Sequence, residues 1–592
     1  MADPAQPARK KRMKQLGNRF PIRLSARVNL KNHLRPAGVL LLGLLLAGCT
    51  AKHYRRSADK AAYAAIREKT PQVPNMDPDF TIEQTNAVVL TGFPVCAEAP
   101  AFLGADGERE RGARQLRLED ALALAVDHGR AYQNRKEQLY LSALSLALTR
   151  HNFTPLFSAQ GSGTFSGQTE RAVRYEVDAV TGDLKPVTSD NLVEQQQVSG
   201  SGQLSASWLI RDVGRLTTSF TTTFLHFLSG GQRPSSQLNA TFVRPLVRDA
   251  GYKQQMEALT QAERQLLYDL RDFTRYRRDF SVQVATAYYG VLSDRDRVRN
   301  SYLNLQSSRK TAEQTRALAA EGRRTQADLG RLEQQELSAE SAWINAIRSY
   351  KQSLDNFKLQ LGLTIDTNLV LDDAELAALH IQHPEINVED SIQVALAGRL
   401  DYLNSQDQLQ DAERRVELTR NLLRPRVDLT SSVTLRSDPN DVSGMAWPQP
   451  ERYSYSAGLD VDPGLDRTAE RNAYRSALIA RDRAARSVEQ QADEIRLQVR
   501  DGWRALDQAK RSYEISEVGV KLAERRVEEQ DLLAELGRAR AQDQVDAQND
   551  LVSSRNQRTQ ALVAHTIARL QFWNNLGILY IKDRGQWETH SQ

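Results

Sequence analysis

The sequence is poor in cysteine and has no hydrophobic run long enough to cross a membrane as a helix. Two cysteines among 592 residues exclude a disulfide-stapled scaffold and a cysteine-rich metal site. Aromatic residues make up 7% of the chain. The most apolar stretch, Ala37–Ala47, would span only about 16 Å as a helix, against ~30 Å for a bilayer core. We therefore expect no bundle of membrane-spanning helices.

The motifs of common catalytic sites are missing as well. The nine histidines include no His-Glu-x-x-His pair for zinc, and the chain has no Gly-x-x-x-x-Gly-Lys-Ser/Thr loop for phosphates. The glycine-rich segment Gly161–Gly167 falls in a strand pattern, so we assign it to sheet packing rather than to nucleotide binding. We therefore expect no enzyme, no metal site and no cofactor other than the covalent lipid described below.

The excess of positive charge is confined to the amino terminus. The chain has 79 Lys and Arg against 74 Asp and Glu. Residues 1–48 contain ten of these basic residues and only one of the acidic residues. Without that segment, 69 basic and 73 acidic residues remain. The rest of the chain thus has no net positive charge with which to bind nucleic acid, and we expect no such partner.

The amino terminus has the plan of a secretion signal. Basic residues precede the apolar run, which ends in Leu-Ala-Gly before Cys49. This ending resembles the lipobox of bacterial lipoproteins, which implies cleavage before Cys49 and acyl chains such as palmitate on that residue. Several acyl chains anchor a protein firmly in lipid. The alternative is a cleaved signal with an incidental cysteine.

Two details refine this signal. Thr50 follows the cysteine where inner-membrane lipoproteins usually carry Asp, so the resemblance implies sorting to the outer membrane. Met13 would give a leader of more ordinary length than Met1, so the true start is one or the other. Once Cys49 carries lipid, Cys96 has no partner within the chain, and we read it as an isolated thiol.

Proline placement indicates two long helical regions. No proline occurs from Leu246 to His383 or from Gly464 to Gln592. In the first region, apolar residues recur at intervals of three and four, which predicts a helix over Tyr252–Glu321 of about 100 Å. The second region predicts a comparable helix over Ala469–Leu536. Helices of this length need other helices to pack against.

The two halves of the chain are related in sequence. At an offset of 270, Tyr132 matches Tyr402 and Pro155 matches Pro425; at an offset of 215, Asp328 matches Asp543. Each half reads as helix, strands, long helix, turn and helix. We therefore expect five segments: a lipoprotein signal peptide at 1–48, a lipid-anchored tether at 49–115, a first structural repeat at 116–380, a second at 381–580 and a tail at 581–592.

The predicted strands alternate apolar and polar residues. This alternation is typical of a lipid-facing barrel with a wet lumen, although a soluble sandwich also alternates. In lipid every backbone group needs a partner, so a sheet of a few strands must close with other copies. Two hairpins supply four strands, and three copies would give about twelve. The six predicted strands are Phe157–Gly167, Val198–Ile210, Leu216–Leu228, Gln237–Val243, Val427–Leu435 and Tyr453–Val461.

With these features the chain resembles the TolC-like outer-membrane efflux proteins, lipoprotein branch, over residues 115–580. The resemblance rests on the duplicated plan, on Arg244–Gly251 at a strand-to-helix junction, and on the turns Gly322–Asp328 and Gly537–Asp543. It implies a mostly α fold with a transmembrane β-barrel, continued by a coiled-coil tunnel through the periplasm. It also implies a homotrimer that serves an inner-membrane pump through a periplasmic adaptor. The chain departs from the family plan in the first half, where four strand patterns replace two. The additional hairpin either lies beside the barrel or widens it.

The resemblance also implies a gate where the long helices reverse. Asp543 and Asp546 match the family's constriction by position, and an acidic ring makes a pore that prefers cations. Asp328 either joins this gate or caps its helix. The family's closing arginine falls on Ala539, so Arg538 or Arg540 would replace it, bonding Asp328 or Thr325. The turns that would contact the adaptor contain Gly322, Arg323, Thr325 and Gly537. The rival to a channel is a lipid-anchored coiled-coil scaffold that spans the periplasm and conducts nothing.

Overall fold

The computed structural model describes residues 51–83, 90–177, 184–228, 231–438, 440, 447–536 and 538–587. The chain divides into two compact units, Met1–Asp59 and Lys60–Gln592. Of the first unit, the structure describes residues 51–59, which belong to helix α2 (Ala51–Lys69). The predicted signal peptide and Cys49 lie outside the described residues. All that follows concerns the second unit.

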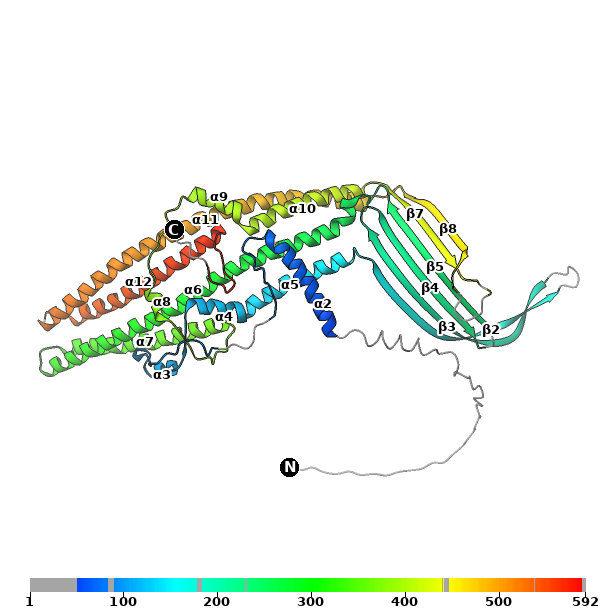
Figure 1. Ribbon diagram of the computed structural model, residues 1–592. Helices are drawn as coiled ribbons and strands as arrows, with labels where there is room; N and C mark the ends of the chain where they lie inside the picture. Colours follow the sequence, from blue (N-terminus) through cyan, green and yellow to red (C-terminus); the bar gives the residue numbers. More distant parts are fainter. Residues whose placement is uncertain are drawn as a thin grey trace, which may run out of the picture. The chain divides into compact units, whose positions relative to one another are not determined.

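Two long helices dominate the second unit (Figure 1). Helix α6 (Tyr252–Ala320) has 69 residues and α11 (Thr468–Glu535) has 68, so each is about 100 Å long. Both predicted long helices are confirmed, with bounds that differ by one residue. Helix α6 packs against α5 (Arg130–His151) near the sheet and against α7 (Gln326–Gln360) near its far end. Helix α11 packs in the same way against α10 (Leu400–Leu422) and α12 (Ala541–Leu576).

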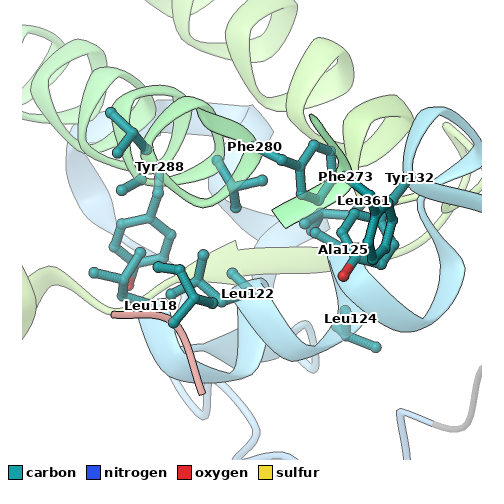
Figure 2. Packing of buried hydrophobic residues seen from close by; sticks show 14 of the residues in the cluster. Leu118, Leu122, Leu124, Ala125, Tyr132, Phe273, Phe280, Tyr288 and Leu361 are labelled. Atoms are coloured by element: carbon teal, nitrogen blue, oxygen red, sulfur yellow. The ribbon is translucent and has the colours of Figure 1, made fainter. Parts of the chain in front are cut away.

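The main core lies where α6 meets the helices of the first half (Figure 2). The ring of Tyr132 packs between Phe273 and Phe280, with centroids 5.8 and 5.1 Å away. Gly362 ends α7 at φ +79°, and a Cβ there would lie 2.0 Å from the His128 carbonyl oxygen. Only glycine fits this close approach, which holds the end of α7 against helix α4 (Leu118–His128).

Short elements surround the middle of the long helices. Strand β1 (Arg114–Leu116) pairs in parallel with β6 (Leu369–Leu371). The short helices are η1 (Thr70–Gln72), η2 (Ala101–Asp106), α3 (Gly107–Glu110), α4 (Leu118–His128), α8 (Asp373–Ala377) and α9 (Val388–Gly398). The predicted tether packs closely over 60–83: Ile66 is buried, and Asn75 exchanges two hydrogen bonds with the backbone of Ile581 at 2.8 and 2.9 Å.

Six antiparallel strands form one sheet at the end of the long helices, in the order β2-β3-β4-β5-β7-β8 (Figure 1). The additional hairpin of the first half therefore belongs to the same sheet as the others. Pairing also extends through much of the polar segment Gln168–Gln197, which we had not predicted as strand. The strands are β2 (Leu156–Val177), β3 (Leu184–Ile210), β4 (Gly214–Phe227), β5 (Gly231–Pro245), β7 (Arg426–Arg436) and β8 (Gln449–Asp462).

The strand register gathers apolar side chains on one side of the sheet, here called the apolar face. One cross-strand row runs through Ala159, Leu204, Phe220, Leu238, Leu435 and Tyr453. Large apolar side chains of this face that stay exposed in the single chain are Phe157, Phe165, Val198, Leu204, Trp208, Leu238, Val433, Tyr453, Tyr455, Leu459 and Val461. The opposite, polar face carries Ser and Thr pairs, such as Ser162 with Ser201 at 2.7 Å.

The sheet does not close within one chain. Among the described strands, β2 and β8 each pair on one side only. None of the described helices has the length and apolar character needed to cross a membrane.

Candidate functional site

The two turns that reverse the long helices lie together at the end opposite the sheet, and we call this end the tip. The first turn joins α6 to α7 and the second joins α11 to α12. Arg324 of the first turn donates a hydrogen bond from Nη1 to the Ala539 carbonyl of the second turn at 2.7 Å. Its Nη2 lies 3.5 Å from the Ala534 carbonyl. One side chain of the first turn therefore ties it to the second.

The first turn is closed by its own backbone and a side-chain cap. Gly322 adopts φ +74°, and the amide of Arg323 bonds the Leu318 carbonyl at 2.9 Å, which together end α6. Thr325 Oγ1 accepts from the Asp328 amide at 3.1 Å and donates to its carboxylate at 2.7 Å. The Thr325 side chain is thus the cap that fixes the start of α7. Asp328 supports this cap by accepting from the Thr325 hydroxyl, and its two predicted roles, helix cap or gate residue, stay predictions.

The second turn is less constrained by side chains. Gly537 lies outside the described residues. The amides of Arg538 and Ala539 both bond the Leu533 carbonyl, at 2.8 and 3.1 Å. Arg540 occupies the cap position of α12, and its side chain caps no amide. Within the described part of the chain, the side chains of Arg538 and Arg540 form no hydrogen bond or ion pair, and both are exposed.

The predicted gate carboxylates stand in the first two turns of α12. Asp543 is exposed, and Asp546 is half-buried and accepts from Gln542 Nε2 at 2.9 Å. Their spacing of three puts them on one side of the helix. Negative charge at this position also suits the amino-terminal end of the helix dipole. Neither carboxylate forms an ion pair with another described residue. Within the described part of the chain, no basic side chain therefore neutralises the charge of this pair.

Each helical hairpin is braced separately above the tip. In the first, Arg316 contacts Glu333 at 2.8 Å and Arg309 reaches Glu336 and Glu340 at 3.4 and 3.3 Å. The second is braced by ion pairs of Arg526 with Asp550 and of Arg555 with Glu524. All of these pairs are largely exposed, so water screens them and each adds little to stability.

Between the hairpins the contacts near the tip are small. A cluster of Ala312, Leu332 and Ala541 is buried, with Val545 against it. Gln335 Nε2 donates to Asn549 Oδ1 at 2.9 Å. Since little apolar area holds the two hairpins together here, separating them at the tip exposes little buried apolar surface.

Two tip residues escaped the sequence prediction. Arg324 bridges the turns, whereas the prediction assigned this work to Arg538 or Arg540. Asp531 of α11 lies near Lys310 of α6, and burial is the main cause that raises the pKa of its carboxyl. Arg323 and Arg324 both follow Gly322 in the sequence. No sequence periodicity indicates which of the two side chains points toward the second hairpin.

Known proteins resemble this chain in structure but not detectably in sequence. No protein-family model and no curated protein matches it. The VceC outer membrane protein of Vibrio cholerae superposes with a TM-score of 0.56 at 14% identity, over 78% of this chain and 96% of VceC. The CmeC outer membrane channel of Campylobacter jejuni gives 0.55 at 12%, over 88% and 96%. The MtrE outer membrane channel of Neisseria gonorrhoeae, in its open state, gives 0.55 at 14%, over 78% and 90%.

These likenesses establish the fold. Each neighbour is matched over nine-tenths or more of its own length, so the shared part includes both the sheet and the helical layer. The resemblance to TolC-like outer-membrane efflux proteins is confirmed at the level of the fold.

Across the described residues, no group of His, Cys, Asp and Glu is arranged to hold a metal ion.

Proposed function

We propose that this chain is the outer-membrane exit duct of a tripartite efflux or secretion system, and that three copies form the duct. The observation that carries the proposal is the sheet, which is apolar on one face, polar on the other and open at both edges. It stands at the end of helices about 100 Å long. A bilayer on one side and water on the other account for the two faces.

The open edges call for further copies of the chain. A sheet in lipid must pair every backbone group, and one copy leaves β2 and β8 half-paired. Closing the sheet with identical copies turns the apolar face outward to lipid and the Ser- and Thr-rich polar face inward. The result is a water-filled pore through the membrane.

The helices offer matching surfaces for the same assembly. Exposed apolar residues recur along α11 and at its C-cap, at successive intervals of three, four, ten and four. They are Ile515 (73% exposed), Val518, Leu522, Leu532 and Leu536 (70% exposed). On α7, Leu337 and Ile344 are exposed seven residues apart. Such stripes form seams between helices. A ring of helices sealed by these seams would extend the pore through the periplasm as a tunnel.

The tip would be the gate of this tunnel. Three copies bring six carboxylates, from Asp543 and Asp546, around one axis. Arg324, Arg538, Arg540 and Asp328 surround them on the two turns. An adaptor that contacts Gly322, Arg323, Thr325 and Gly537 could compete for the bonds of Arg324 and open the tip. The weak joint between the hairpins supports a rearrangement at this place.

The amino terminus would hold the duct in its membrane. In this proposal the signal 1–48 is removed, Cys49 carries the lipid, and the segment to residue 115 leads from the anchor to the helices. The protein then lies in the bacterial outer membrane and extends into the periplasm. Its partners are a periplasmic adaptor and an inner-membrane pump.

The second candidate is a lipid-anchored coiled-coil scaffold without a channel. It accounts for the helices and the anchor. It leaves the apolar face of the sheet without a purpose, since Phe157 (82% exposed) and Tyr455 (76% exposed) would face water. The sheet therefore favours the duct.

The test is assembly and conductance of the purified mature protein. We expect a trimer that resists SDS until it is heated, and ion conductance when the trimer is added to planar bilayers. A chain that stays monomeric and soluble without detergent would contradict the duct. A trimer that binds membranes but conducts nothing at any voltage would favour the scaffold.

A further inference from the structure

The sheet has more strands than the helices beneath it require. Four helices connect to it, α5 to β2, α6 to β5, α10 to β7 and α11 to β8. Strands β3 and β4 connect to no helix. They are joined by the turn Arg211–Val213, at the end of the sheet that faces the helices.

The turn Arg211–Val213 has a defined backbone conformation and fits closely against the sheet. Asp212 adopts φ +60° and the Val213 amide bonds the Ile210 carbonyl at 3.1 Å. Gly214 follows at φ +150°, where a Cβ would lie 2.3 Å from the Val243 carbonyl oxygen of β5. The start of β4 is thus fitted closely to its neighbour.

Strands β3 and β4 are full members of the sheet. They pair with each other over Gln197–Ile210, and β4 pairs with β5 over Arg215–Phe227. Their even-numbered residues continue the apolar face, with Leu204 beside Phe220 and Trp208 beside Leu216. A hairpin that lay beside the barrel would have no reason to share both the pairing and the apolar face.

Six strands also match the width of the helical layer. Strands spaced ~4.8 Å apart and tilted by ~40° occupy about 38 Å for six and about 25 Å for four. Four packed helices at 8–10 Å occupy roughly 32–40 Å. With six strands the sheet is as wide as the helices that carry it, whereas four strands would narrow the wall at the junction.

We infer that each copy supplies six strands and that three copies close a barrel of eighteen strands, in which β2 of one copy pairs with β8 of the next. This inference rests on the proposed trimeric duct. Six is an even number, so β8 and the neighbour's β2 run antiparallel, as the other strands do. The barrel would measure ~36 Å between opposite backbones, against ~24 Å for twelve strands.

The occupant of each open edge is therefore the opposite edge of a second copy. Both edges carry apolar residues on the same side: Phe157 and Phe165 on β2, Tyr453 and Tyr455 on β8. Joining them continues the apolar band without interruption. Barrels of sixteen to eighteen strands keep an aqueous channel, so the wall itself would not restrict cargo.

The test is disulfide trapping between copies. Cysteine pairs on the polar face join Ser158 or Ser162 of β2 with Ser454 or Ser456 of β8, in a Cys96→Ser background. A competing set joins Thr221 or Thr223 of β4 with the same β8 positions. In one chain, four strands lie between β2 and β8 and two lie between β4 and β8, so every disulfide formed must link two copies. The background protein alone shows what Cys49 contributes.

We expect oxidation to trap dimers and trimers through at least one β2–β8 pair and through no β4–β8 pair. Trapping through β4–β8 would mean a twelve-stranded barrel with the β2–β3 hairpin outside it, and would overturn the inference while the duct stands. An SDS-resistant trimer trapped by neither set would overturn it as well. A monomer would remove the proposed duct and this inference together.

A deletion variant supplies the matched control. Removal of residues 168–229 joins Gly167 to Gly230, so that Ser166 and Gly231 flank a Gly-Gly turn of the kind that favours two-residue hairpins. The register places Ser166 and Gly231 in one cross-strand row, so β2 can pair directly with β5. This variant has four strands and must close through β2 and β8. If oxidation traps the β2–β8 pair in the deletion variant but not in the full chain, the oxidation works and the inference is wrong.

Discussion

The two ends of the second unit hold together in different ways. At the sheet end, cross-strand pairing runs without a break from β2 to β8, and one row of apolar residues crosses all six strands on one face. At the tip, the two helical hairpins meet through a few small side chains and the bonds of Arg324. One end is a continuous network, and the other depends on single contacts.

The difference shows where this protein can change shape. Opening the sheet would break many backbone hydrogen bonds at once, and in lipid none of them could be replaced by water. Separating the hairpins at the tip exposes little apolar surface and frees groups that water can solvate. A duct of this design would keep its membrane end constant and move at the periplasmic end.

The largest effect should come from charge on the apolar face. We expect Leu204→Arg to abolish the SDS-resistant trimer, because an arginine near the middle of the lipid-facing band costs about 2–4 kcal/mol in each copy. Leu204 pairs with Phe220 at the centre of β4. Gln203→Arg, one residue earlier on the polar face, is the control and should leave the trimer intact. Equal loss in both variants would mean that the face is not in lipid.

The next effect concerns the joint between the hairpins. Arg324→Ala removes the charged donor that holds the second turn, and such bonds contribute roughly 1–3 kcal/mol. We expect a tip that opens at least tenfold more often, measured as open probability in planar bilayers. Arg323→Ala is the control, since among the described residues the Arg323 side chain forms an ion pair with Glu321 of its own turn alone, at 3.7 Å. If the two variants behave alike, Arg324 does not hold the tip.

A smaller effect is expected on ion selectivity. Asp543→Asn combined with Asp546→Asn removes six charges from a trimer while keeping similar side-chain volume. The preference for cations over anions should fall several-fold in single-channel recordings, because it depends on negative charge at the constriction. Asp328→Asn should leave selectivity unchanged if Asp328 acts only by supporting the Thr325 cap. Unaltered selectivity in the double variant would contradict the gate assignment.

The smallest effect tests the cap of the first turn. Thr325→Val removes the oxygen that accepts from the Asp328 amide, which should cost about 1 kcal/mol. Hydrogen exchange at the first turn of α7 should rise accordingly, while exchange at the sheet stays the same. Thr325→Ser keeps the oxygen and should behave like the natural chain. Faster exchange in the sheet as well would mean that the two ends are coupled.

Elements that depend on local pattern could be predicted from the amino-acid sequence. The proline-free stretches and the three-four spacing of apolar residues predicted α6 and α11 to within one residue. Alternation predicted all six strands, and Gly322 predicted the end of α6. These features depend on neighbours along the chain, whose geometry a helix or a strand fixes.

Which strands pair, and which side chains of the two turns come into contact, could be seen in the folded chain alone. Alternation cannot tell whether β3 and β4 join the main sheet, because pairing partners far apart in sequence decide that. The polar stretch after Gly167 shows no clear alternation of apolar and polar residues. It still forms strand, because the β2–β3 pairing that begins nearer the helices continues into it. Arg323 and Arg324 look alike in sequence, and only the approach of the second hairpin selects Arg324. Partner choice depends on distances across the fold, which no local pattern encodes.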